Sequence, residues 1–245
     1  MVLERQTKAP LRRIVQAFVD RGDAPFDGRL FGIALGNFPG EDADHRRPEH
    51  RRVVDPLAAT LKLLLSLGEF NVPGTDERHF GLPADIAFLP DGTMFVADGY
   101  YNSRIVKFTR EGKFITAWGK KGAGEGDFNL PHSVAVDKEG RVYVGDRENY
   151  RMQVFDANGK FIAQWKHIGS PWGVVIADDG SIFMCDGHNN RILKLDRDGK
   201  ILGVLSGPGK LPGELDYSHH LAIGPSRSLY VAEIKNWRVQ KFAAQ

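Results

Sequence analysis

One pattern of 40 to 48 residues occurs four times along the chain. Its copies begin at LPADIAF (82–88), LPHSVAV (130–136), SPWGVVI (170–176) and SHHLAIG (218–224). In each copy an acidic residue closes the second apolar run, 15 positions after the residue that anchors the first: Pro83 to Asp98, Pro131 to Asp146, Pro171 to Asp186 and Ser218 to Glu233. A repeat of this kind cannot bury its apolar face alone, so the units are expected to stack on one another.

Each unit consists of four short runs in which apolar and polar residues alternate. In the second copy the runs are SVAV, RVYVGD, RMQVFD and KFIAQW, and turn pairs such as EG and NG separate them. Alternation with period two indicates half-buried strands and not helices. Four antiparallel strands in a repeat of this length are typical of a β-propeller blade, so we predict an all-β propeller.

The N-terminal part lacks a clear copy but contains three strand-like runs: LFGIAL (30–35), RRVVD (51–55) and KLLLSLG (62–68). We interpret residues 1–28 as an N-terminal segment, 29–79 as a degenerate first blade and 80–245 as the propeller blades proper, all in one domain. The last copy lacks its fourth strand, so an N-terminal segment is expected to complete it and close the ring. This arrangement favours five blades, with four or six as the alternatives.

Charge and cysteine content exclude several classes of partner and site. The 33 Lys and Arg against 31 Asp and Glu give a net charge of +2, which is too small to imply nucleic acid or an anionic membrane as a partner. We expect neither partner, and we expect a monomer. With Cys185 as the single cysteine, a metal must be held by His, Asp, Glu or backbone oxygen. We found no signal-peptide or membrane-spanning pattern, which makes the cytoplasm the default expectation.

The position after each anchor residue is the first place to look for chemistry. In a propeller the starts of the innermost strands converge on the central axis, where a ligand can bind. Two of the four residues at this position are histidines, the set being Ala84, His132, Trp172 and His219. The alternative is that these imidazoles only hydrogen-bond the loop of a neighbouring blade.

The turn after each acidic residue also recurs. In DRENYR, DGHNNR and EIKNWR, Asn and Arg follow the acid by three and five positions, whereas in DGYYNSR they follow by four and six. One residue has been inserted, so Tyr100 or Tyr101 is expected to protrude. We expect the repeated Asn to adopt the left-handed turn conformation and the repeated Arg to bind the acid.

The repeats resemble the NHL-repeat propellers over residues 60–245, and three segments carry a narrower resemblance. VADGYYNSRIVKF, FNLPHSVAVD and GDRENYRMQVF are similar to peptidyl-α-hydroxyglycine α-amidating lyases, propeller enzymes that cleave a C-terminal α-hydroxyglycine to a peptide amide and glyoxylate. This resemblance implies a catalytic zinc bound by His132 and His219, a catalytic Tyr100 and a substrate-binding Arg147. The segment RGDAPFDG (21–28) resembles an early family segment and implies Arg21 as a second substrate arginine.

The implied chemistry suits these residue types. The substrate is a carbinolamide, a small molecule or peptide whose C–N bond breaks once the hydroxyl proton is removed. Zinc on that hydroxyl acts as a Lewis acid. A phenol has an ordinary pKa of about 10 and becomes a competent base where a cation favours its phenolate, so Tyr100 beside zinc and Arg147 is the expected general base. Zinc is the expected cofactor, with a structural calcium ion as a second candidate metal.

Several positions depart from the family pattern. The family uses three inner-strand histidines, and Phe31 occupies the place where the first is expected, with His50 as a candidate substitute. His220 stands where an acid commonly follows the last ligand, and Tyr101 replaces a cysteine of animal members.

Two other functions stay open because the third histidine is missing. The main alternative is a non-catalytic NHL propeller that binds a protein, peptide or nucleic acid on one rim. The other is a lactonase-type hydrolase with calcium and carboxylates, which needs converging acids on the inner strands.

Overall fold

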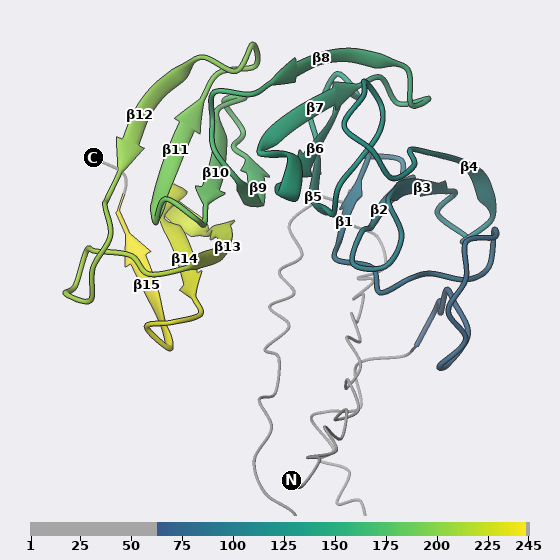
Figure 1. Cartoon of the computed structure of the whole chain (residues 1–245), viewed down its shortest axis with the longest axis horizontal. Helices are drawn as coiled ribbons and strands as arrows, with labels where there is room; N and C mark the ends of the chain where they lie inside the picture. Colours follow the sequence, from purple (N-terminus) through teal and green to yellow (C-terminus); the bar gives the residue numbers. More distant parts are fainter. Residues whose placement is uncertain (1–62, 244–245) are drawn as a thin grey trace, which may run out of the picture. The chain divides into compact units, whose positions relative to one another are not determined.

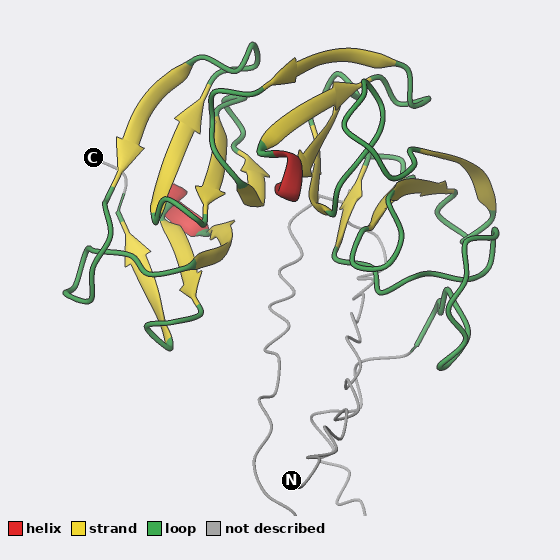
Figure 2. Cartoon of the chain, viewed as in Figure 1, coloured by secondary structure: helices red, strands yellow, loops and turns green. Residues whose placement is uncertain are grey.

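Four antiparallel sheets follow one another along the chain in the computed structural model, which describes residues 63–243. Residues 67–243 fall within one compact unit, and the fold below is that of this unit. The sheets lie side by side in chain order, and Figure 2 shows that strands account for nearly all of their regular structure. The all-β propeller architecture is therefore confirmed, with four blades in the described part of the chain.

Each of the first three sheets has four strands joined in simple succession. The first contains β1 (Asp85–Phe88), β2 (Met94–Asp98), β3 (Arg104–Phe108) and β4 (Phe114–Trp118). The second contains β5 (Pro131–Val136), β6 (Val142–Asp146), β7 (Arg151–Phe155) and β8 (Phe161–Trp165). The third contains β9 (Pro171–Ile176), β10 (Ile182–Asp186), β11 (Arg191–Leu195) and β12 (Ile201–Leu205).

The fourth sheet has three strands, β13 (Ser218–Ile223), β14 (Leu229–Glu233) and β15 (Arg238–Phe242). Two single-turn 3₁₀ helices, η2 (Arg147–Asn149) and η3 (Pro225–Arg227), are the helical elements of the described residues. The first strands of the sheets contact one another, β1 with β5, β5 with β9 and β9 with β13, while β4, β8 and β12 lie on the outside (Figure 1).

Adjacent sheets pack on each other through three apolar clusters, because each sheet has an apolar face that only its neighbour can bury. Between the first two sheets the cluster includes Phe95, Phe128 and Phe155. Met152, Met184 and Leu193 belong to the next cluster, and Trp172, Leu221 and Val231 to the last. Side chains of adjacent blades contribute to every cluster, so a single blade has no complete core.

The acidic residue after each second strand is the centre of a repeated buried network. The arginine at the start of the third strand donates from Nε to this carboxylate at 2.7–2.9 Å, in the pairs Asp98–Arg104, Asp146–Arg151, Asp186–Arg191 and Glu233–Arg238. A backbone N–H of the loop before the same blade also donates to each carboxylate, from Gly81, Asn129, Ser170 and Asp216. The expected bond between Arg and acid is thus present in all four copies.

The prediction for the repeated Asn was wrong. The left-handed residue of the turn is the next one along, at Tyr150, Asn190 and Trp237, with φ of 54°, 54° and 51°. The Asn before it uses its side-chain Nδ2 instead, and Asn149 donates to both Asp146 and the carbonyl oxygen of Gly122 at 2.8 Å. Asn is selected here as a hydrogen-bond donor, and its tolerance of positive φ is not what the turn uses.

The degenerate first blade is not confirmed. Residues 30–35 and 51–55 lie outside the described residues, and so does the segment expected to close the ring. Residues 63–67 of the third expected strand belong to no sheet, and the Leu63 and Leu64 side chains are 76% and 58% exposed. A strand needs a hydrogen-bonded neighbour, and the one predicted for this run is not among the described residues.

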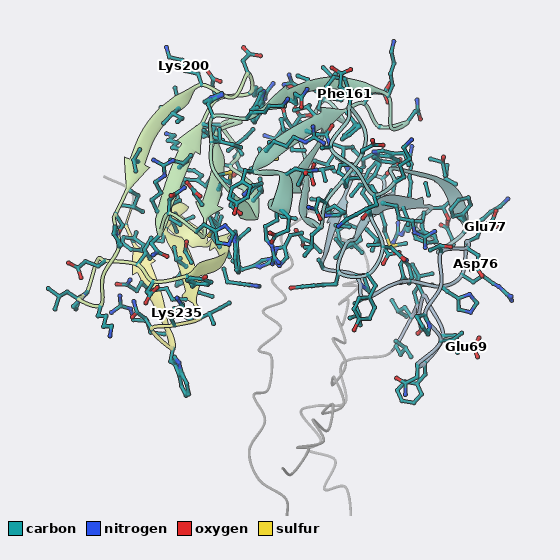
Figure 3. All side chains as sticks on the ribbon, in the orientation of Figure 1. Glu69, Asp76, Glu77, Phe161, Lys200 and Lys235 are labelled. Carbon is teal, nitrogen blue, oxygen red and sulfur yellow. The ribbon has the colours of Figure 1, made fainter. Side chains whose placement is uncertain are left out.

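Residues 74–81 instead form the loop before the first described blade. Carbonyl oxygens of Thr75, Asp76 and His79 accept from the Arg104 guanidinium, as those of Ala123, Gly124 and Asp127 accept from Arg151. Asp76 and Glu77 mark this loop in Figure 3. The loop before the first described blade therefore binds Arg104 as the loop before the second blade binds Arg151.

We expect Arg151→Ala to lower the free energy of unfolding by about 3–5 kcal/mol, because it leaves the fully buried Asp146 carboxylate without its cation. Urea denaturation measures this change. Arg197→Ala is the control, since Arg197 pairs with Glu139 on the surface and its loss is expected to cost less than about 1 kcal/mol. Equal denaturation midpoints for the two variants would show that the buried network does not stabilise the blade.

Candidate active site

The histidines at the equivalent positions of two blades lie against each other. His132 is the extra residue of a β-bulge in β5, since Pro131 pairs with Asp146 and Ser133 with Gly145. His219 occupies the same bulge in β13, between the pairs Ser218–Glu233 and His220–Ala232. The two ring centroids are 5.0 Å apart. A bulge re-aims the residue it contains, which is how two strands of different blades present imidazoles to one place.

Tyr100 contacts this histidine pair from the first blade. Its Oη lies 2.9 Å from His132 Nε2, and its ring is 41% exposed. His132 Nδ1 lies 2.6 Å from the carbonyl oxygen of Trp172, which can only accept, so Nδ1 carries the proton and Nε2 accepts from the phenol. Tyr101, the other tyrosine of the turn, is 69% exposed.

The glycine before Tyr100 explains why this turn reaches the second blade. A Cβ on Gly99 would lie 1.9 Å from the carbonyl oxygen of Pro131, so only glycine allows the turn to lie directly against the start of β5. The Tyr100 and Tyr101 N–H groups donate to the carbonyl oxygens of Leu82 and Gly81. The turn is thereby held at both sides, and Tyr100 is directed at the residue after Pro131.

Arg147 brings positive charge to the same place. It is the first residue of η2, and its guanidinium carbon lies 4.5 Å from the centre of the Trp172 ring and 5.9 Å from that of Tyr100. Its Nε donates to Glu148 at 2.9 Å. The structure thus brings together Tyr100, His132, Arg147 and His219, whereas Arg21, Phe31 and His50 lie outside the described residues.

Both bulge histidines are expected to be neutral near pH 7. Burial, together with the charges of His219 and Arg147, holds the pKa of His132 well below its ordinary value. Burial, His220 and Arg147 lower the pKa of His219 to about 4. A neutral imidazole has one ring nitrogen with a lone pair, which can accept a proton or bind a metal.

Two residues beneath the bulge positions were not recognised as site residues from sequence. They are Asp85 of β1 and His220 of β13, which occupy the next position along the inner strand, as Ser133 and Gly173 do in the other blades. Burial raises the pKa of Asp85, while His220 and two N–H groups, of Val134 and Ile86, oppose this rise. Their shared position two residues after the anchors Pro83 and Ser218 was the signal that could have found them.

Trp172 was also missed as a site residue, although its position was identified. Besides accepting from His132 through its carbonyl, it contacts His219 and Tyr217 with ring centroids 5.4 Å away in both cases. The Lys235 Nζ, from the turn after β14 (Figure 3), lies 3.8 Å from the Tyr217 ring centre. Trp172 therefore contacts both histidines of the pair as well as Tyr217, and forms one aromatic side of the site.

The side chains of the site differ in how well they suit a metal ion. Among residues 63–243, no three His, Cys, Asp or Glu side chains are already grouped as metal ligands. The chemistry of the pair nevertheless suits a transition metal, because neutral imidazole is the ligating form and both His132 and His219 are held neutral. No helix in this part of the chain is both long and apolar enough to cross a membrane.

The NHL repeat family matches residues 80–108 and 128–155, which cover the first three strands of each of the first two described blades. The chain thus contains NHL repeats in a propeller. It resembles the amidating lyases in particular: the mouse peptidyl-glycine alpha-amidating monooxygenase is 47% identical over 111 residues, covering 42% of this chain and 11% of that protein.

A second relative carries the lyase name itself. The probable peptidyl-alpha-hydroxyglycine alpha-amidating lyase of Caenorhabditis elegans is 44% identical over 104 residues, covering 41% of this chain and 29% of the relative. These matches span less than a third of either relative. Among solved structures, a Bacteroides fragilis protein has a TM-score of 0.50 at 14% identity, covering 70% of this chain and 53% of that one, a likeness of fold alone.

We expect Gly173→Ala to destabilise the protein by about 1–3 kcal/mol, because its Cβ would lie 3.0 Å from backbone atoms of both His219 and His220 and would push β9 from β13. Thermal and urea unfolding measure this. Gly203→Ala is the matched control in β12, where a Cβ meets no atom within 4 Å and no loss is expected. The close packing of β9 on β13 would be refuted if Gly173→Ala were as stable as Gly203→Ala.

Proposed function

We propose that this chain carries the site of a zinc-dependent lyase that cleaves a C-terminal α-hydroxyglycine to an amide and glyoxylate. The observation that supports this most directly is the 2.9 Å contact of Tyr100 Oη with His132 Nε2, next to His219 and Arg147. These four residues come from three blades, and the resemblance to the amidating lyases implies the same four. The names of the relatives point the same way.

Zinc fits the neutral His132 and His219 imidazoles, and when bound it would supply a Lewis acid for the substrate hydroxyl. The remaining chemistry belongs to the protein. Tyr100, as the phenolate, removes the hydroxyl proton through Oη. The O–H electrons form the aldehyde C=O bond, the C–N bond breaks, and its electron pair stays on the amide nitrogen. Tyr100 returns the proton to that nitrogen, so no proton is consumed.

Arg147 is the proposed partner of the substrate carboxylate. Its Nε is bound to Glu148, so the terminal nitrogens of the guanidinium are the groups that would make a bidentate pair. The stacking of Arg147 on Trp172 holds the guanidinium plane in one orientation. A carboxylate bound there would place the neighbouring carbinol carbon near Tyr100, whose ring centre lies 5.9 Å from the guanidinium carbon.

We expect the purified full chain, loaded with zinc, to release glyoxylate from α-hydroxyhippurate. Tyr100→Phe should lower the rate by about 100-fold or more, since it removes the acid–base group. The control is Tyr101→Phe, one residue away on the exposed side of the same turn, which should keep the wild-type rate. Equal rates for the two variants would remove Tyr100 from the mechanism.

The alternative function is a non-catalytic NHL propeller that binds a partner on one rim. It is favoured by the absence of three grouped metal donors among residues 63–243. The same assay separates the two functions. If the wild-type chain with zinc releases no glyoxylate above background, the lyase proposal is wrong and the binding function is the better account.

A further inference from the structure

The bulge of β13 brings two consecutive histidines into the candidate site. In a β-bulge two residues face one residue of the partner strand, so neighbouring side chains come closer than in a regular strand. His219 and His220 have ring centroids 5.2 Å apart, and His220 is 6.1 Å from His132 by the same measure. Three imidazoles from two blades therefore lie with ring centroids 5.0–6.1 Å apart, although their nitrogens are not yet arranged around one point.

The nitrogen atoms of the consecutive histidines have a spacing that suits a shared cation. His220 Nδ1 lies 3.2 Å from His219 Nδ1. Two nitrogens on a tetrahedral zinc, each bound at about 2.0–2.1 Å, are separated by about 3.3 Å. The hydrogen bond between them needs a proton on one nitrogen, so both lone pairs can bind one ion once each ring carries its proton on Nε2.

Two neighbours from other blades support this placement of His220. Gly173 of β9 leaves the space that the ring needs, since a Cβ there would lie 3.0 Å from His220 Cα and 3.6 Å from its Cγ. Asp85 of β1 interacts electrostatically with His220, and its carboxylate is held by the N–H groups of Val134 and Ile86 at 3.0 and 2.8 Å. A fixed carboxylate beside an imidazole group offsets the charge of a bound cation.

We propose that His220 is the third metal ligand of this chain, joining His132 and His219 in a three-imidazole site for zinc with Asp85 as the charge-balancing neighbour. The proposal rests on the metal of the proposed function and supplies the ligand that the sequence lacked. Metal binding at this site would also change the hydrogen bond that Tyr100 makes with His132. His132 Nδ1 donates to the Trp172 carbonyl oxygen, so Nε2 holds the lone pair that would bind the metal, and the Tyr100 hydroxyl would then lose its present acceptor.

Zinc titration of the chelator-stripped full chain tests this proposal by calorimetry. The wild type should bind one zinc ion, and His220→Ala should weaken the affinity at least 100-fold, because loss of a ligand should exceed the roughly 10–100-fold cost of losing a supporting residue. His132→Ala and His219→Ala should weaken it as strongly. His167→Ala is the control, since that imidazole contacts the carbonyl oxygen of Gly199 instead.

His50→Ala decides between the two candidates for the third ligand. We expect it to leave the zinc affinity unchanged. If it abolishes binding while His220→Ala does not, or if the wild type binds no zinc at all, the proposal is overturned. Thermal unfolding with and without zinc guards against misfolded variants: His220→Ala should keep the metal-free Tm and lose only the rise that zinc produces.

The outcome is separable from that of the proposed lyase activity. Zinc binding that depends on His220 in a chain that releases no glyoxylate would leave the metal site standing and refute the activity. Glyoxylate release by His220→Ala at wild-type zinc affinity would do the opposite.

Discussion

The buried carboxylate after each second strand is the interaction on which the rest of this structure depends. Asp98, Asp146 and Asp186 are fully buried and Glu233 nearly so. A charge removed from water is tolerated only when it is paired and its oxygens accept hydrogen bonds. Here the partners are an arginine, an asparagine and an N–H group of the preceding loop, so one carboxylate ties three segments together. The bond from the loop N–H therefore fixes the position of the inner strand that starts after the loop, as Asn129 does for β5.

The residues that could carry chemistry occupy a few equivalent positions of four similar blades. The pair formed by the residue after the anchor and the next one is Ala84 and Asp85, His132 and Ser133, Trp172 and Gly173, and His219 and His220. The buried network recurs in all four sheets and the bulge in the second to fourth, so the pairs occupy equivalent places, and no two pairs are the same. A fold of this kind shows where a site lies, and only the variable pairs and the inserted Tyr100 indicate its chemistry.

Much of the fold could be predicted from the sequence repeat. Period-two alternation and the constant offset of 15 residues predicted the strands, their antiparallel order and the Arg–acid pairs. The blade count in the N-terminal part was not predictable to the same degree, since residues 63–67 have strand-like composition but no strand. The role of Asn149 was misjudged because turn propensity describes one residue, whereas a side-chain bond to Gly122, 27 positions away, depends on how the blades pack.

For the candidate site, residue spacing alone established that His132 and His219 hold equivalent places and that the Tyr100 turn has one extra residue. It could not establish that Tyr100 meets His132, that Trp172 accepts from the same ring, or that Asp85 interacts electrostatically with His220. These interactions join residues of different blades, 32, 40 and 135 positions apart, and they depend on how the blades pack. Local pattern specifies each blade, and the packing of one blade on the next creates the site.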